Sequence, residues 1–262
     1  MNIHPTAIVH PSAELAEDVE VQAYSIIGPH VKIGPGSVVG PHCVVDGRTV
    51  LGARNVIYSG AQIGVVSQDK KHRGNFVGRA HIGDDNVFRE HVTISASTIA
   101  AEEDDRRVTT IGNDCMFMAN SHVGHDSHVG NSVIMANSVA LAGHVDVHDF
   151  ANIGGLCGVH QECVVGTMAF VGGLTRVSKD PPPYMIVEGN PPRCGGPNQI
   201  GLRRRGLDEA TRDRIKRMYK LMWLSKLNTT QALQEIERSV DPSVERETFV
   251  SFVRGSVRGI IK

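Results

Sequence analysis

Aromatic residues are scarce in this chain: they make up 5% of its 262 residues and include a single tryptophan. Hydrophobic residues as a class still reach 40%, so the interior must be filled mainly by aliphatic side chains. Long apolar runs are missing too, since no stretch of about 18 apolar residues occurs. The first ten residues, MNIHPTAIVH, lack the basic and apolar regions of a secretion signal. We therefore expect a globular, cytoplasmic protein without a membrane span.

An excess of either charge is also absent, because 27 lysines and arginines nearly balance 28 aspartates and glutamates. A chain with a net charge of −1 has no general attraction for nucleic acid, and we expect no nucleic-acid partner. The five cysteines are odd in number and form no CxxC pair. This pattern favours reduced thiols over a disulfide scaffold or a zinc ribbon.

What the sequence has instead is an aliphatic residue at every sixth position. The step runs from Ile3 to Ile63 without a miss, continues from Ile82 to Ile94, and resumes from Ile111 to Val177. A hexapeptide period with nearby glycine, asparagine or aspartate is typical of a parallel β-helix, in which each unit supplies one short strand and one turn. Three units close one triangular coil, so residues 18 apart should stack. An α-helix would instead need apolar residues every three or four positions.

Two spacings, of nineteen and seventeen residues, break this period within polar stretches. We predict loops there, near residues 64–81 and 95–110, and surface loops on a rigid scaffold often carry binding residues. The repeat ends after Val177, where residues 178–201 hold six prolines and four glycines. We expect this segment neither to continue the strands nor to start a helix.

The C-terminal part reads as a small helical domain. Asp208 should cap an amphipathic helix, and two further helices are predicted at residues 230–239 and 243–254. The apolar face of the first helix consists of Ile215, Met218, Tyr219, Met222 and Trp223. We expect a mainly β chain with a β-helix over residues 1–190 and a helical domain over residues 191–262.

Histidine is concentrated in residues 119–150, which carry five imidazoles. An imidazole beside a carboxylate has a fixed tautomer and a more basic outer nitrogen, as a general base for a hydroxyl requires. Gly143 has no side chain, so its backbone N–H can face an oxyanion beside His125. The columns produced by stacking at intervals of 18 are Asp126–His144–Glu162 and His125–Gly143–Gln161.

A lone histidine at such a turn is usually a solvated surface residue, and we assign His128 and His148 to the surface. The alternative chemical interpretation of the cluster is a metal site, since imidazoles are common zinc ligands. Hexapeptide-repeat trimers similar to the γ-class carbonic anhydrases hold zinc with histidines from two subunits, and Asp126 and Glu162 suit either interpretation. The histidines of the candidate site are His122, His125, His144 and His160.

Short motifs that are more specific than the hexapeptide repeat are spread over the whole chain: SQDKK, NSHVGHD, LAGHV, GVHQ, PPPYMIVEGNPP, GLRRRG and the terminal SVRGIIK. With them the chain resembles the acyl-[acyl-carrier-protein]–UDP-N-acetylglucosamine O-acyltransferases of lipid A biosynthesis. The resemblance implies a left-handed parallel β-helix with a C-terminal helical domain, assembled as a homotrimer with active sites between subunits. The left hand comes from the resemblance alone, since the periodicity does not give it.

The resemblance also implies roles for individual residues. His125 matches the general base that takes the proton of the sugar 3-hydroxyl as it attacks the acyl thioester. Asp126 matches the carboxylate that orients this base, and the Gly143 N–H matches the group that stabilises the oxyanion.

The remaining matches are binding residues. Adjacent guanidiniums suit a diphosphate because each can donate two charge-assisted hydrogen bonds to phosphate oxygens, although an arginine run is as often a solvated surface. A basic helix face can dock an acidic carrier protein, or it can simply be solvated. The matched positions are the cleft histidines His122, His144 and His160, the loop residues Asp69 and Lys71, the polar contacts Gln161 and Asn198, the phosphate pair Arg204 and Arg205, and Gly173 at the floor of the acyl groove.

Departures from the family pattern leave the substrates open. Ser95, Ala96 and Ser97 replace His-Arg-Gly, and Ile200 stands where the family has an acidic residue. The sequence predicts transfer of a fatty acyl group, expected to be 3-hydroxylated, from acyl carrier protein to the 3-position of UDP-N-acetylglucosamine, without metal or cofactor. The alternatives are a 3-amino sugar acceptor, a zinc-dependent enzyme, or a protein that binds these ligands without turnover.

Overall fold

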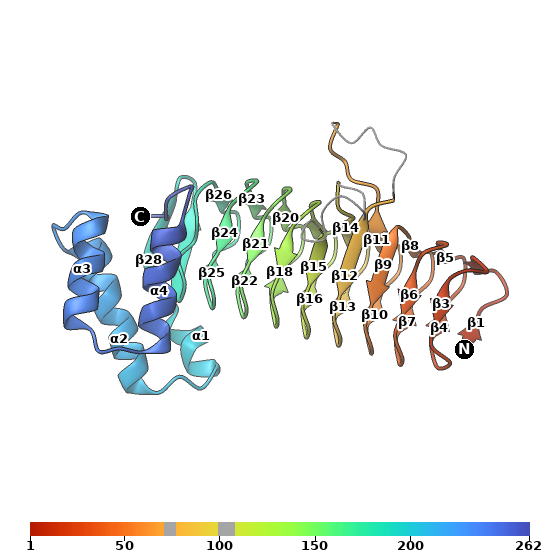
Figure 1. Ribbon diagram of the computed structural model, residues 1–262, viewed down its shortest axis with the longest axis horizontal. Coiled ribbons are helices and arrows are strands. Elements are labelled where there is room, and N and C mark those ends of the chain that lie inside the picture. The colour runs from red at the N-terminus through yellow and green to blue at the C-terminus, as the bar shows by residue number, and fades with distance from the viewer. Residues whose placement is uncertain (71–76, 99–107) are drawn as a thin grey trace.

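The computed structural model describes residues 1–70, 77–98 and 108–262. Within these residues the chain forms one long three-sided solenoid of short strands, with a group of helices packed at its C-terminal end (Figure 1). The three faces are separate sheets, each built from every third strand of the sequence. The predicted parallel β-helix is therefore confirmed.

The strands of each face pair in parallel along the solenoid, apart from the antiparallel last pair of sheet A. Sheet A holds β1 Asn2–Ile3, β4 Glu20–Val21, β7 Val38–Val39, β10 Val56–Ile57, β13 Val87–Phe88, β16 Met116–Phe117, β19 Ile134–Met135, β22 Asn152–Ile153, β25 Phe170–Val171, β27 Met185–Gly189 and β28 Pro192–Pro197. Sheet B holds β2 Ile8–Val9, β5 Ile26–Ile27, β8 Val44–Val45, β11 Gln62–Val65, β14 Thr93–Ser95, β17 His122–Val123, β20 Ala140–Leu141, β23 Gly158–Val159 and β26 Arg176–Val177. Sheet C holds β3 Glu14–Leu15, β6 Lys32–Ile33, β9 Arg48–Leu51, β12 Arg79–Ile82, β15 Thr109–Ile111, β18 His128–Val129, β21 Asp146–Val147 and β24 Val164–Val165.

The register steps by 18 residues along the unbroken coils. On sheet B, His122 pairs with Ala140, and Ala140 pairs with Gly158. Each two-residue strand directs its second side chain inward, so Val123 and Leu141 are fully buried while Ala140 is exposed. The predicted stacking of residues 18 apart is confirmed, and it fixes which side chains meet at each corner.

The corners are turned by residues in the left-handed backbone region. Asp126, His144 and Glu162 occupy equivalent corners of three successive coils with φ of 55°, 58° and 60°. Aspartate and histidine adopt this conformation more readily than most residues other than glycine and asparagine. Since neighbouring parallel strands lie about 4.8 Å apart, side chains at equivalent corners come within contact distance.

The interior of the solenoid is packed with aliphatic side chains, as the composition predicts. Phe88 and Phe117 are fully buried and stack with ring centroids 5.0 Å apart. A buried pair of asparagines lies among these side chains: the Asn55 Oδ1 atom accepts hydrogen bonds from the backbone and the side chain of Asn86. The five cysteines are free thiols in this structure, four of them buried.

The proline-rich segment 178–201 differs from its prediction. It forms β27 and β28, which extend sheet A as an antiparallel pair, and its last residues begin a helix. Proline is tolerated in β28 because this is the edge strand, where a missing N–H breaks no further ladder. The Asn198 side chain accepts a hydrogen bond from the Gly201 N–H and caps α1, Gln199–Arg204.

The helical predictions hold with small shifts of boundary. Asp208 caps α2, Glu209–Tyr219, which passes into a π-helical turn, η1, Lys220–Leu224. The other two helices are α3, Thr229–Ser239, and α4, Val244–Gly255. Ile215, Met218 and Met222 of the predicted apolar face are buried in a second hydrophobic core. In the described part of the chain, no helix is long and apolar enough to span a bilayer.

Candidate functional site

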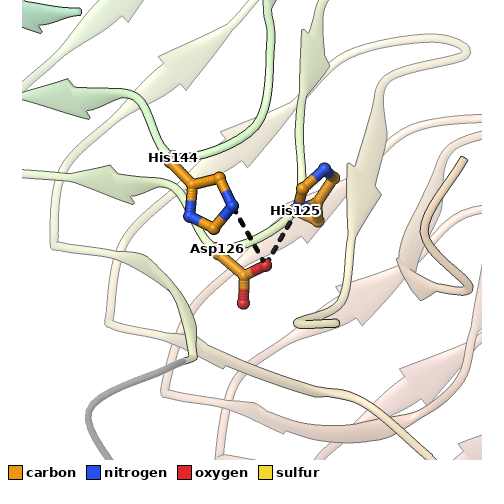
Figure 2. Close-up of side chains that lie close together, drawn as sticks. All are labelled: His125, Asp126 and His144. Carbon is orange, nitrogen blue, oxygen red and sulfur yellow. Dashed lines mark hydrogen bonds and ion pairs between the residues drawn. The ribbon is translucent and has the colours of Figure 1, made fainter. Parts of the chain in front are cut away.

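The His125 imidazole is hydrogen-bonded to the neighbouring Asp126 carboxylate at the corner after β17. The His125 Nδ1 and Asp126 Oδ2 atoms are 2.8 Å apart, and Asp126 is only 4% exposed (Figure 2). An ionised carboxylate can only accept, so Nδ1 carries the proton and donates it to this bond. The Nε2 atom of His125 then presents its lone pair as an acceptor.

Asp126 is held on two further sides by threonines. The backbone N–H and the hydroxyl of Thr98 donate to its carboxylate, at 3.2 and 2.6 Å, and its own N–H donates to Thr109 Oγ1 at 2.9 Å. Burial alone would raise the pKa of the Asp126 carboxyl. The hydrogen bonds from His125 and Thr98 outweigh burial and lower this pKa to about 2. The carboxylate is therefore ionised at neutral pH.

A cavity of about 650 Å³ lies beside this pair. Asp69 enters it from the segment after β11, and its Oδ2 atom is 3.9 Å from His125 Nε2. Two carboxylates thus flank the imidazole, one on each nitrogen. The predicted site residues that line the cavity are Asp69, His122, His125, Gly143, His160 and Gln161.

The other histidines surround this pair in distinct ways. Burial, with a smaller effect of His125, lowers the pKa of His122, whose Nδ1 atom is 2.7 Å from Thr93 Oγ1. His144 meets His125 edge to face, with centroids 5.1 Å apart, and its Nε2 atom is 3.9 Å from Asp126 Oδ2 (Figure 2). His160 is exposed and bonds through Nδ1 to the Gln161 carbonyl oxygen. The predicted clustering of these histidines is observed.

A second cavity, of about 720 Å³, holds Asn198, Arg204 and Arg205 on the face of sheet A. Its wall is largely apolar, and the Arg205 guanidinium lies 4.5 Å from the centre of the Phe150 ring. Ile200, where the family pattern is acidic, lines this cavity and is 57% exposed. The predicted binding residues are therefore divided between two separate cavities of one chain.

One predicted residue lies away from both groups. Gly173 is at an exposed corner above Gly155 and lines neither cavity. Lys71 lies outside the described residues. The sequence interpretation missed Thr98, which touches Asp126, and Arg176, which lines the first cavity. Arg176 follows Gly158 by 18 residues, so the stacking rule contained the signal for it.

The metal interpretation can be tested against ligand spacing. Three possible ligand atoms lie within 4.8 Å of one another, one each from His125, Asp126 and His144. Tetrahedral zinc with bonds of about 2.0–2.1 Å would bring its ligand atoms to about 3.4 Å. The Asp126 carboxylate also already accepts hydrogen bonds from His125 and Thr98. The three groups fit a hydrogen-bonded base better than a closed zinc site.

Comparison with known proteins agrees with this geometry. Residues 180–261 match the family model described as UDP-N-acetylglucosamine O-acyltransferase, domain 2, and residues 12–47 match the bacterial transferase hexapeptide model. A protein named acyl-[acyl-carrier-protein]–UDP-N-acetylglucosamine O-acyltransferase from Anaeromyxobacter sp. Fw109-5 is 45% identical over all of both chains. The protein of that name from Pseudomonas entomophila is 43% identical over 100% of this chain and 99% of its own.

Solved structures give the same result. The UDP-N-acetylglucosamine O-acyltransferase of Moraxella catarrhalis superposes with a TM-score of 0.94 at 35% identity over all of both chains. The corresponding structure from Acinetobacter baumannii gives 0.92 at 37% identity over 99% of each chain. The solenoid is accordingly a left-handed parallel β-helix. With this agreement over its full length, the chain belongs to the acyl-[acyl-carrier-protein]–UDP-N-acetylglucosamine O-acyltransferase family.

Proposed function

We propose that this protein transfers a fatty acyl group from acyl carrier protein to the 3-hydroxyl of UDP-N-acetylglucosamine, the first step of lipid A biosynthesis. The observation that carries the proposal is the 2.8 Å bond between His125 Nδ1 and an ionised, buried Asp126, beside a cavity of about 650 Å³. The names of the 45% and 43% identical relatives supply the two substrates.

The reaction begins with proton transfer. His125 Nε2 takes the proton of the sugar hydroxyl while the oxygen attacks the thioester carbonyl carbon, and Asp126 stabilises the imidazolium that forms. The tetrahedral intermediate then collapses and breaks the carbon–sulfur bond. The departing thiolate receives the proton from His125, so the products are an ester and a free carrier thiol.

The negative charge on the carbonyl oxygen needs a donor during this step. Gly143 lies one coil beyond His125, and its N–H makes no hydrogen bond to protein within the described residues. A backbone N–H that is fixed and unpaired before the reaction stabilises an oxyanion without reorganisation. The thioester is already activated, so this mechanism requires no metal or tightly bound cofactor.

We further propose that the second cavity binds the nucleotide diphosphate, with Arg204 and Arg205 on the phosphates. In one chain it is separate from the His125 cavity, which supports a homotrimer with active sites between subunits. Mixing an H125A chain with an R204A/R205A chain tests this proposal. Two inactive variants should regain activity on joint refolding; persistent inactivity of mixed trimers would refute a shared site.

Mass spectrometry tests the activity itself. The purified protein is offered 3-hydroxyacyl carrier proteins of several chain lengths, with UDP-N-acetylglucosamine and with its 3-amino analogue. We expect a mass gain of one acyl chain on the 3-hydroxyl acceptor, in keeping with a cytoplasmic enzyme of lipid A synthesis. Product only from the amino sugar would change the acceptor, and no product from any pair would refute the proposed function.

A further inference from the structure

Thr98 lies directly behind the proposed base. It follows β14 and is half-buried, and it lines neither of the two cavities described above. Its hydroxyl is 2.6 Å from Asp126 Oδ2, the same oxygen that accepts the bond from His125 Nδ1. Its backbone N–H adds a second donor to the carboxylate, 3.2 Å from Oδ1.

The backbone of Asp126 is fixed separately. Its N–H donates to Thr109 Oγ1 at 2.9 Å, and Thr109 is almost fully buried in β15. With φ at 55°, Asp126 turns this corner in the left-handed backbone region. Thr109 therefore holds the backbone of this corner, and Thr98 holds the carboxylate.

From this arrangement we propose that Thr98 is a positioning residue of the acyl transfer reaction: it holds the Asp126 carboxylate in the orientation that accepts the hydrogen bond from His125 Nδ1. Thr98 acts through Asp126, because only Asp126 stands between it and the imidazole. A hydrogen bond to a charged group is stronger than one to a neutral group, and it restricts the orientation of its acceptor. The expected change in kcat rests on the proposed function, whereas the expected effect on the orientation of Asp126 and the tautomer of His125 does not.

The charged and titratable groups around the pair set what a titration would report. Asp126 Oδ2 faces His125 and, at 3.9 Å, His144 Nε2; His125 Nε2 faces Asp69 at 3.9 Å, and His122 lies on the adjacent strand. Of these groups, Thr98 touches only Asp126 among the described residues. Removing its hydroxyl therefore alters the pair through the carboxylate. Loss of this donor raises the pKa of the Asp126 carboxyl, because its charged form is then less stabilised.

Two substitutions at Thr98 and one control test the proposal. Thr98→Val removes the hydroxyl at nearly constant shape, and Thr98→Ser retains it. Thr110→Val is the matched control. Like Thr98, Thr110 is half-buried and its hydroxyl is hydrogen-bonded to a side chain, but that partner is His128, at 2.9 Å, away from the site. The measurements are kcat, both KM values and the pH dependence of kcat/KM, with folding checked by thermal unfolding.

We expect Thr98→Val to lower kcat roughly 10- to 100-fold, as loss of a hydrogen bond to a charged group implies. Both KM values should stay within about twofold, since Thr98 lines no cavity. The acidic limb of the pH profile should move to higher pH. Thr98→Ser should restore kcat and the position of the acidic limb, and Thr110→Val should change neither of them. A Thr98→Val enzyme with normal kcat and an unmoved limb would overturn the proposal, as would a loss that serine does not rescue.

A second measurement does not depend on turnover. Nitrogen-15 NMR of the histidine rings reports which nitrogen carries the proton. Wild-type His125 should show the proton fixed on Nδ1, and Thr98→Val should show a mixture of tautomers. An unchanged fixed tautomer in Thr98→Val would refute the positioning role even if the protein proved inactive in every acyl-transfer assay.

Discussion

A Cβ atom built on Gly143 would lie 2.5 Å from both Cε1 and Nε2 of the His125 imidazole in the preceding coil. Carbon atoms do not approach this closely, so any side chain at residue 143 must displace the ring. Gly143, whose N–H is the proposed oxyanion donor, and His125, the proposed base, therefore lie directly against each other on adjacent coils. A base and an oxyanion donor on adjacent coils can act on one acyl carbon.

Gly143→Ala should therefore impair catalysis without unfolding the protein. Its backbone is not in the left-handed region, so the cost comes from the displaced imidazole. We expect kcat to fall roughly 100-fold, because small misplacement of a catalytic group is costly. The control is Gly158→Ala in the same cavity, where an added Cβ meets no atom within 4 Å. Equal losses in both variants would argue against the His125 contact as the cause.

His125→Ala should remove nearly all turnover, since no other described group within the cavity has the same bond to an ionised carboxylate. The loss expected for a general base is about 10²- to 10⁴-fold. The comparison variant is His128→Ala, on β18, where the imidazole bonds Thr110 instead. Acyl-transfer rates at saturating substrates, with circular dichroism to confirm folding, decide the matter. Near-normal turnover of a clean His125→Ala preparation would contradict the mechanism.

Asp126 should also leave a signature in stability. Its pKa of about 2 in the folded protein lies below the ordinary value of 3.8, so its charged form stabilises the fold. That contribution, on the order of 2 kcal/mol, is present above about pH 4 and is lost as the pH falls through about 2. The Asp126→Asn variant has no carboxylate at this position and therefore lacks this contribution to stability. Urea unfolding at pH 7, 5 and 3 should show the two proteins converging toward low pH, whereas a constant gap would mean that Asp126 does not titrate this way.

The sequence predicted much of this architecture because the fold is itself periodic. Val123 and Leu141 follow the hexapeptide count, and the same count places Asp126 beside His144. A rule that relates residue numbers directly to positions in space gives contacts as well as strands. The placement of His122, Gly143 and Gln161 around one cavity follows from it.

The rule fails where the period stops. Residues 178–201 contain prolines that suit an edge strand as well as a loop, and only the position of β28 at the end of sheet A distinguishes these cases. Thr98 lies beyond the last periodic residue before the second break, 28 residues from Asp126. No interval of 18 connects the two, so their contact could not be counted from the sequence.

The junction between solenoid and helices provides the last prediction. Asp180 is 1% exposed; it accepts hydrogen bonds from the Val164 N–H at 2.9 Å and from the Ser256 hydroxyl at 2.5 Å. Its backbone also pairs with Gly259 and Ile261, so it fastens the C-terminal segment to the last coil. Asp180→Ala removes the buried carboxylate that accepts hydrogen bonds from these two half-buried donors.

We expect Asp180→Ala to destabilise the protein by about 3 kcal/mol, because it removes two hydrogen bonds to a buried carboxylate at once. Ser256→Ala removes only one donor and leaves the carboxylate bonded to Val164, so its loss should be nearer 1 kcal/mol. Urea unfolding of both variants at one fixed protein concentration gives the comparison, because assembly makes apparent stability depend on concentration. If Ser256→Ala proved as destabilising as Asp180→Ala, the bond to the Val164 N–H would contribute nothing to stability. The attachment of the C-terminal segment would then depend on the Ser256 bond alone.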